Sequence, residues 1–198
     1  MYPTLSYPAK KVPKTLLENE SIELLSYAKT VSLRDFTILH FALTTGLRNS
    51  ELCNLTMECV LSYQIVPNIL MLPGTIAKGG DGREIPLHPD TRKNLETFFS
   101  WKHDHKEPLS PNSYVFVSKF AHNQLSPRDI QRIVNQISDY SIGRSIHPHT
   151  LRHTFATKLL AVSNLEIVRK VLGHKNIQTT QIYLHPSTDE VSKAINQL

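Results

Sequence analysis

The segment SIHPHTLRHTFATKLL brings histidines and one arginine together at a spacing that could do chemistry. In a helix that starts near Pro148, His149, Arg152 and His153 stand at i, i+3 and i+4 and share one face. Two histidines four residues apart on a helix can bind zinc. Here Thr150 replaces the glutamate that serves as general base in the metalloprotease motif, and a permanently charged guanidinium repels a divalent cation but suits a phosphate. The alternative is a capped helix whose histidines are structural.

Other segments supply further groups that could act on a phosphodiester. Arg48 lies in TTGLRNSEL, Lys78 in AKGGDGREIPL, and His174 and Tyr183 in LGHKNIQTTQIYLH. Arginine and histidine can bind the nonbridging oxygens, a tyrosine can attack phosphorus once nearby cations favour its phenolate, and a lysine can protonate the leaving oxygen. Taken singly, they could be a surface arginine, a turn lysine, a helix-capping histidine and a core tyrosine. Their joint order and spacing favour the chemical interpretation.

The elements that must position these groups are predicted to be mostly helical. Helical patterns cover residues 16–30, residues 32–46 with Ser32 as cap and Gly46 as stop, and residues 126–140 with Ser126 as cap. QIVPNILML and REIPLH are β-type runs on either side of AKGGDG, so we predict a hairpin between about residues 64 and 88. The predicted fold class is mostly α with a small antiparallel β-sheet.

Composition narrows the class of protein. With 198 residues and 40% hydrophobic content the chain can form one compact domain, and 22 Lys and Arg against 17 Asp and Glu hint at an anionic partner. Cys53 and Cys59 are expected to be reduced core residues. No apolar run approaches the roughly 20 residues of a membrane span, and no signal peptide is recognisable, so we expect a cytoplasmic chain without a membrane partner. Residues 1–14 are predicted to be a linker or arm rich in proline and lysine, and residues 15–198 one domain.

Taken in order, these motifs resemble the tyrosine recombinase family, which includes phage integrases, recombinases that resolve chromosome dimers, and transposon integrases. The resemblance runs from about residue 15 to the C-terminus and rests on TGLRNSEL, the hairpin lysine and its distance to Ile-Pro-Leu, HTLR, LGH and TTQIY. It implies the tyrosine recombinase catalytic-domain fold for residues 15–198. It also implies a set of catalytic residues that comprises Arg48, Lys78, His149, Arg152, His174 and Tyr183.

The resemblance implies a site-specific DNA recombinase, or integrase, that cleaves and rejoins DNA through a 3′-phosphotyrosyl intermediate. His149 is expected to help accept the proton of Tyr183, and Lys78 to protonate the 5′ oxygen. Glu51 is expected to orient Arg48. Because the tyrosyl phosphodiester keeps the bond energy, a second 5′ hydroxyl can reverse the step, and neither ATP nor a metal cofactor is required.

The implied partners are double-stranded DNA recombination sites and further copies of the chain, assembled as a tetramer on two duplexes. His153 is expected to be buried on the core side of its helix, and residues 187–198 to form an amphipathic helix that docks on a neighbouring protomer or folds back in cis. We favour an excised catalytic domain over a short recombinase like those that invert fimbrial promoters. The alternatives in function are a type IB topoisomerase-like enzyme, a DNA-binding module without catalysis and a zinc hydrolase.

Overall fold

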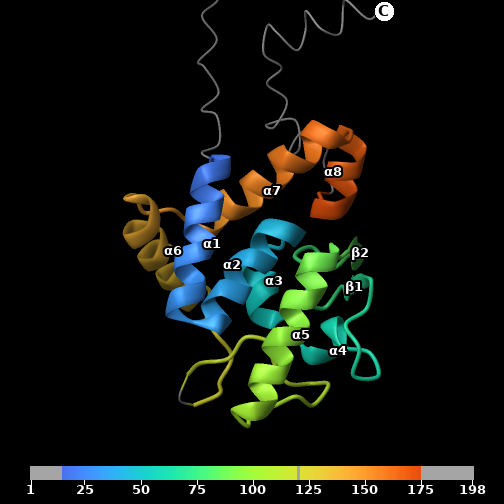
Figure 1. The fold of residues 1–198 in the computed structure, drawn as a ribbon. Helices are drawn as coiled ribbons and strands as arrows, with labels where there is room; N and C mark the ends of the chain where they lie inside the picture. Colours follow the sequence, from blue (N-terminus) through green and yellow to red (C-terminus); the bar gives the residue numbers. More distant parts are fainter. Residues whose placement is uncertain (1–14, 120, 175–198) are drawn as a thin grey trace, which may run out of the picture.

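The structure is a computed structural model that describes residues 15–119 and 121–174. Helices dominate these residues, and the strands are confined to one hairpin (Figure 1). The elements in chain order are α1 (Glu18–Val31), α2 (Leu33–Thr45), α3 (Asn49–Asn54), α4 (Met57–Val60), β1 (Ile69–Leu72), β2 (Arg83–Pro86), α5 (Pro89–Asp104), α6 (Pro127–Ile142), α7 (Pro148–Val162) and α8 (Leu165–Leu172). The predicted fold class is confirmed.

The predicted hairpin is present between residues 64 and 88. β1 and β2 pair antiparallel, with Ile69 opposite Pro86 and Leu72 opposite Arg83. Side chains alternate across the two faces, so Leu70, Leu72 and Ile85 are buried while Ile69 is exposed. The intervening turn contains Lys78, which lines a hollow together with Gly173 and His174.

Local capping fixes the helix ends that the sequence predicted. The Ser32 hydroxyl accepts a hydrogen bond from the backbone N–H of Asp35 at 3.3 Å, which starts α2. Ser126 accepts from the backbone N–H of Asp129 at 3.2 Å, which starts α6. Gly46 ends α2 with φ of 64°, a left-handed conformation that disfavours a side chain. These starts and stops agree with the sequence analysis.

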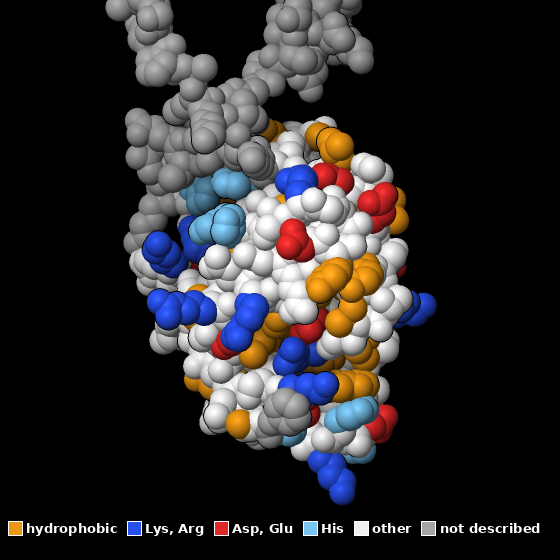
Figure 2. Space-filling view, turned by 90° about the vertical axis from the view of Figure 1, so that its left-hand side faces the viewer, with side chains coloured by type: hydrophobic (Ala, Val, Ile, Leu, Met, Phe, Trp, Pro, Cys, Tyr) orange, Lys and Arg blue, Asp and Glu red, His pale blue; other side chains and the backbone are white. Residues whose placement is uncertain are grey.

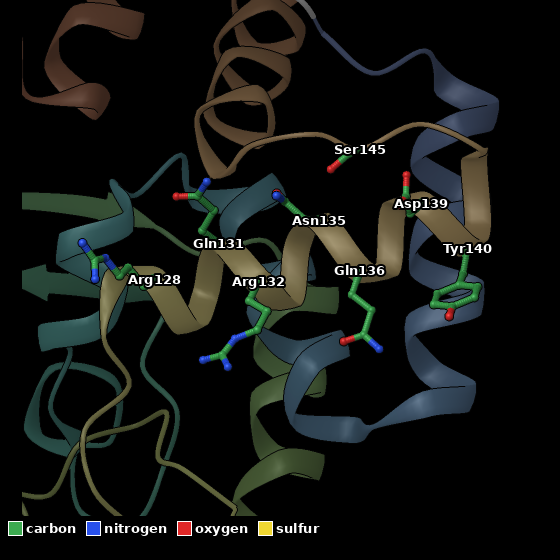
Figure 3. A pocket seen from close by; sticks show the side chains of 8 residues that line it. All are labelled: Arg128, Gln131, Arg132, Asn135, Gln136, Asp139, Tyr140 and Ser145. Atoms are coloured by element: carbon green, nitrogen blue, oxygen red, sulfur yellow. The ribbon is translucent and has the colours of Figure 1, made fainter.

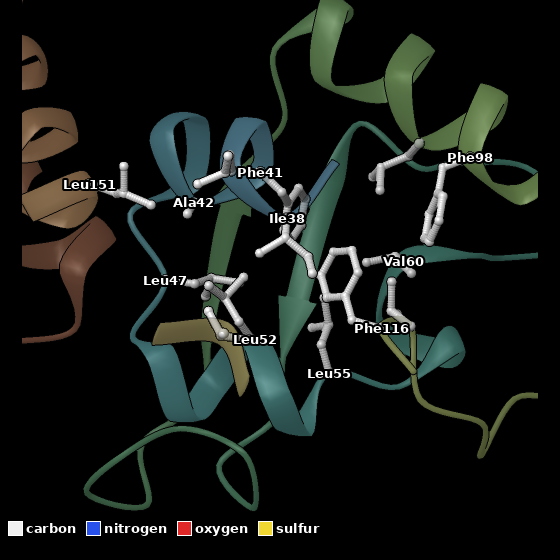
Figure 4. Packing of buried hydrophobic residues seen from close by; sticks show 14 of the residues in the cluster. Ile38, Phe41, Ala42, Leu47, Leu52, Leu55, Val60, Phe98, Phe116 and Leu151 are labelled. Carbon is white, nitrogen blue, oxygen red and sulfur yellow. The ribbon is translucent and has the colours of Figure 1, made fainter. Parts of the chain in front are cut away.

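The main core surrounds α2, which packs against α1, α5, α6 and α7 (Figures 1 and 4). Ile38 and Phe41 of α2 are fully buried, and the Phe41 ring lies 6.4 Å from the ring of Phe116. Cys53 and Cys59 are buried free thiols, as predicted. Within residues 15–119 and 121–174, no helix is long and apolar enough to cross a membrane.

The end of the molecule formed by α7 and α8 is where separate segments meet. α7 packs against α2 and α8, and α8 packs against β2 (Figure 1). This packing brings the C-terminal end of α8 close to the start of α3 and to the hairpin. Residues from four segments of the sequence, namely the α2–α3 junction, the hairpin, α7 and the end of α8, can therefore share one site.

Candidate active site

Arg48 stands at the junction between α2 and α3. The left-handed Gly46 turns the chain, and Arg48 becomes the N-cap residue of α3. Its Nη1 donates to Glu51 Oε1 at 2.8 Å, its backbone N–H donates to Glu51 Oε2 at 2.8 Å, and its Nη2 donates to the carbonyl of Gly173 at 3.1 Å. The carboxylate of Glu51 is fully buried. These contacts agree with the expectation that Glu51 orients Arg48.

Arg152 is buried on α7, which begins at Pro148 as the sequence predicted. Its Nη1 donates to the carbonyl of Gly46, and its Nη2 donates to the carbonyl of Leu172 at 2.9 Å. The same Nη2 lies 3.0 Å from Nε2 of His174. Since a guanidinium is a donor only, Nε2 accepts, and the proton of the neutral ring lies on Nδ1.

The electrostatics of His174 agree with this assignment. Burial, and then the charges of Arg152 and Arg48, lower the pKa of His174 to about 4. The ring is therefore neutral near pH 7. A neutral ring adds no further full positive charge to the arginines around it.

The C-terminal end of α8 is held by arginines. Helix C-termini carry unsatisfied carbonyls and partial negative charge, which cations stabilise. Three successive carbonyls each accept from a different guanidinium: Val171 from Arg83 Nε at 2.8 Å, Leu172 from Arg152 Nη2 at 2.9 Å, and Gly173 from Arg48 Nη2 at 3.1 Å. The position of His174, the next residue, is thus tied to α3, α7 and β2.

Lys78 lies exposed in the turn of the hairpin. Its backbone N–H lies 3.4 Å from Glu51 Oε1, and its side chain lines a hollow of about 460 Å³ together with Gly173 and His174. The next two residues, Gly79 and Gly80, both have positive φ, at 106° and 84°. Glycine tolerates these conformations without the strain that a side chain would introduce.

His149 lies exposed in the first turn of α7. Its partial desolvation, and then the charges of Arg152 and Lys78, lower its pKa, so the ring is neutral near pH 7 and can accept a proton. The ring of His153 lies 6.4 Å away. His153 is half-buried rather than buried, because its place on α7 is at the edge of the core, and that expectation was wrong.

The chain matches the Phage integrase family over residues 14–190. It belongs to this family. A tyrosine recombinase of Pseudothermotoga lettingae is 37% identical over 191 residues, which are 96% of this chain and 62% of that protein. The tyrosine recombinase XerA of Pyrococcus horikoshii is 35% identical over 191 residues, which are 95% of this chain and 62% of that protein. The chain thus spans less than two thirds of these relatives.

Solved structures support the same fold for this phage integrase family member. The crystal structure of a XerA recombinase matches with a TM-score of 0.76 at 25% identity and covers 99% of this chain and 66% of that chain. The Tn1549 transposon integrase in complex with transposon right end DNA matches with a TM-score of 0.70 at 21% identity. The match covers 96% of this chain and 67% of that chain. XerH bound to its difH substrate matches with a TM-score of 0.73 at 20% identity. The match covers 96% of this chain and 55% of that chain.

The family member's fold brings most of the residues selected from the sequence into one place. Arg48, Lys78, Arg152 and His174 surround the end of α8, and His149 lies within electrostatic reach of Lys78 and Arg152. Tyr183 and the predicted helix over residues 187–198 lie outside the described residues. In the described part of the chain, no group of three or more His, Cys, Asp or Glu side chains is arranged to hold a metal ion.

One residue at the centre of the site, Arg83, was not predicted from the sequence. Arg83 is the first residue of β2, and its side chain is 7% exposed. A signal was present, because alternation along the strand REIP places Arg83 on the same face as the buried Ile85. An arginine on the buried face of a strand requires a buried partner.

Proposed function

We propose that this chain is the catalytic part of a site-specific DNA recombinase that cleaves and rejoins DNA through a 3′-phosphotyrosyl intermediate. The observation that carries the proposal is the convergence of Arg48, Lys78, Arg152 and His174 at the end of α8. A transferring phosphoryl group is stabilised by positioned cationic and hydrogen-bonding donors of this kind. The relatives named tyrosine recombinases and the neighbours solved with DNA point to the same substrate class.

In the proposed reaction, Arg48 and Arg152 bind the nonbridging oxygens of one phosphodiester, and His174 adds a neutral donor. Both guanidiniums are held by carbonyls of the protein, so their positions are set before DNA arrives. This preorganisation lowers the entropy cost of placing two long side chains around one phosphate.

The proton transfers follow from the protonation states. Tyr183 would bond to phosphorus while the bond from phosphorus to the 5′ oxygen breaks. His149, whose pKa is lowered, is the proposed acceptor of the tyrosine proton. Lys78, exposed beside the same hollow, is the proposed donor to the 5′ oxygen. Attack by another 5′ hydroxyl on the tyrosyl phosphodiester runs the same steps in reverse and restores both groups.

The outer face of α6 is suited to contact the duplex. Ile130, Val134 and Ile137 face the core, and the opposite face is polar. Side chains on this polar face line an open cleft (Figure 3). The residues of α6 that line it are Arg128, Gln131, Arg132, Asn135, Gln136, Asp139 and Tyr140. Figure 2 shows Lys, Arg and His side chains from the left edge of the displayed face down to its lower end, with acidic side chains among them. Arginine and glutamine can bind both phosphates and base edges, so we assign this cleft to DNA.

The assembly and the domain limits are further parts of the proposal. We propose that residues 15–198 form the catalytic domain and residues 1–14 a linker or arm, and that protomers assemble as a tetramer on DNA. A cytoplasmic location belongs to the same proposal, since cellular DNA is the proposed substrate. Support comes from the family membership, which covers residues 14–190.

The test is a covalent adduct between the protein and DNA. The purified chain is incubated with duplex fragments that flank its gene, and adducts are separated under denaturing conditions and mapped. The unmutated protein should form the adduct, and Tyr183→Phe should not. Tyr63→Phe is the control, because Tyr63 is 97% exposed in the segment between α4 and β1 and contacts none of the proposed catalytic residues in the described hydrogen bonds. An adduct that survives Tyr183→Phe would contradict the assignment, and relaxation of a plasmid without exchange between paired sites would indicate a topoisomerase.

A further inference from the structure

Arg83 makes contacts that connect the hairpin to both α3 and α8. Its Nη1 donates to Glu51 Oε1 at 3.0 Å and its Nη2 donates to Glu51 Oε2 at 2.8 Å, so the two groups form a bidentate pair. Its Nε donates to the carbonyl of Val171 at 2.8 Å. The guanidinium is thereby fixed in one plane by two segments that are distant in sequence.

Glu51 depends on this second arginine. Its carboxylate is fully buried and accepts from Arg48 through the backbone and through Nη1, in addition to Arg83. A buried carboxylate is costly unless it stays paired with a cation. When Arg48 engages a DNA phosphate, it must share its positive charge between that phosphate and Glu51. Arg83 leaves Glu51 paired throughout.

We infer that Arg83 is a positioning residue that holds Arg48 in its phosphate-binding orientation by fixing the carboxylate of Glu51. The inference rests on the proposed recombinase function, in which Arg48 binds the reacting phosphate. Arg83 itself does not touch the phosphate in this arrangement, because its donors are directed to Glu51 and Val171.

Gly173 leaves space for the side chain of Arg83. A Cβ atom at Gly173 would lie 3.1 Å from both Cδ and Nη1 of Arg83, which is tighter than an ordinary contact. Gly173 also has φ of 64° as the C-cap residue of α8. Glycine at this position therefore satisfies the helix end and leaves room for the guanidinium.

The inference is tested with Arg83→Gln and Arg83→Lys in single-turnover DNA cleavage. Displacement of a substrate-positioning group by about 1 Å can cost on the order of 10²-fold in rate, so we expect about that loss for Arg83→Gln with DNA affinity little changed. Lysine keeps the charge but not the bidentate geometry, so Arg83→Lys should recover part of the rate. Arg144→Gln is the matched control, because Arg144 pairs bidentately with Glu20 away from the site and its loss should leave the cleavage rate unchanged.

A substrate that carries sulfur in place of the 5′ bridging oxygen distinguishes whether Arg83 acts through Arg48 or through Lys78. A thiolate leaves without an acid, so this substrate rescues defects in Lys78 but not defects in binding the nonbridging oxygens. Because Glu51 contacts Arg48 closely and the backbone of Lys78 only at 3.4 Å, we expect no rescue for Arg83→Gln. Rescue would mean that Arg83 acts through the hairpin lysine, and would overturn the inference.

Two further measurements separate this inference from the proposed function. In a double-mutant cycle, Arg83→Gln should cost much less in a Glu51→Gln background than alone, whereas equal costs would show that Arg83 does not act through Glu51. A crystal structure of Arg83→Gln, or of Arg83→Lys if the first variant does not fold, should show Arg48 displaced from Glu51 and Gly173. An unmoved Arg48 would overturn the inference even if the protein cleaves no DNA, while an unmutated protein without any DNA adduct would overturn only the proposed function.

Discussion

Replacing Glu51 by glutamine should change how the free energy of unfolding depends on pH. Burial raises the pKa of Glu51, but hydrogen bonds and charge from Arg83 and Arg48 outweigh it and hold the pKa at about 2, against an ordinary value of 4.5. A tenfold change in a protonation equilibrium is worth about 1.4 kcal/mol, so the ionised Glu51 contributes about 3 kcal/mol to stability.

The sign follows from the lowered pKa. The folded protein holds the ionised carboxylate more strongly than the unfolded chain does, so the contribution is complete well above pH 4.5 and is lost as the pH falls toward 2. About 2 kcal/mol of it should be gone by pH 3. Glutamine does not titrate, and a variant that carries it should lack this part of the pH dependence.

The assay is urea unfolding followed by the fluorescence of Trp101, the one tryptophan of the chain, between pH 7 and pH 3. At pH 7, Glu51→Gln leaves Arg83 and Arg48 without their buried counter-ion and should cost about 3 to 5 kcal/mol. The difference in free energy of unfolding between the unmutated protein and Glu51→Gln should be about 2 kcal/mol smaller at pH 3 than at pH 7.

A matched control is available in Glu20, a carboxylate that pairs bidentately with Arg144 near the surface. Its pKa is also lowered, first by the hydrogen bond from Arg144, but the Arg144 side chain is 38% exposed and solvent screens such a pair. Glu20→Gln should therefore lower stability by less than about 1 kcal/mol. If the unmutated protein and Glu51→Gln differ in free energy of unfolding by the same amount at pH 7 and at pH 3, the reasoning is refuted.

The remaining predictions concern catalysis, backbone conformation and DNA binding. Lys78→Ala should cleave ordinary DNA about 10² to 10⁴ times more slowly yet cleave the 5′ bridging sulfur substrate almost normally, and equal defects on both would remove Lys78 from the role of acid. Gly46→Ala should lower the free energy of unfolding by about 1 to 3 kcal/mol. The reason is that φ is 64° and the new Cβ would lie 2.3 Å from Cδ1 of Phe155. Thermal denaturation measures the effect, and an unchanged melting temperature would contradict the prediction. DNA affinity, measured by fluorescence anisotropy, should fall with salt with a log-log slope of about −0.9 per phosphate neutralised, and a flat response would argue against phosphate contacts.

The sequence by itself determined the element boundaries that depend on near neighbours. Ser32 and Ser126 cap helices through backbone groups three residues away, and Gly46 ends α2 through its own φ. The hairpin is similarly local, since Gly79 and Gly80 supply the positive φ values that the turn uses. Such interactions act within a few residues, so they can be predicted from a short window of sequence.

The order and spacing of the motifs also predicted which residues would gather. Arg48, Lys78, Arg152 and His174 do meet at the end of α8, although their catalytic roles stay predictions. Spacing could not indicate how the arginines are held, because that depends on which carbonyls face them after α7 and α8 have packed.

The tertiary structure alone decided the buried electrostatics. Glu51 and Arg83 are 32 positions apart, and nothing within either segment specifies their pairing. It arises because β2 packs against α8 and beside α3, which removes water from both charges and leaves each as the other's partner. The half-buried state of His153 has the same origin, since the depth of a side chain depends on what covers it rather than on its position along a helix.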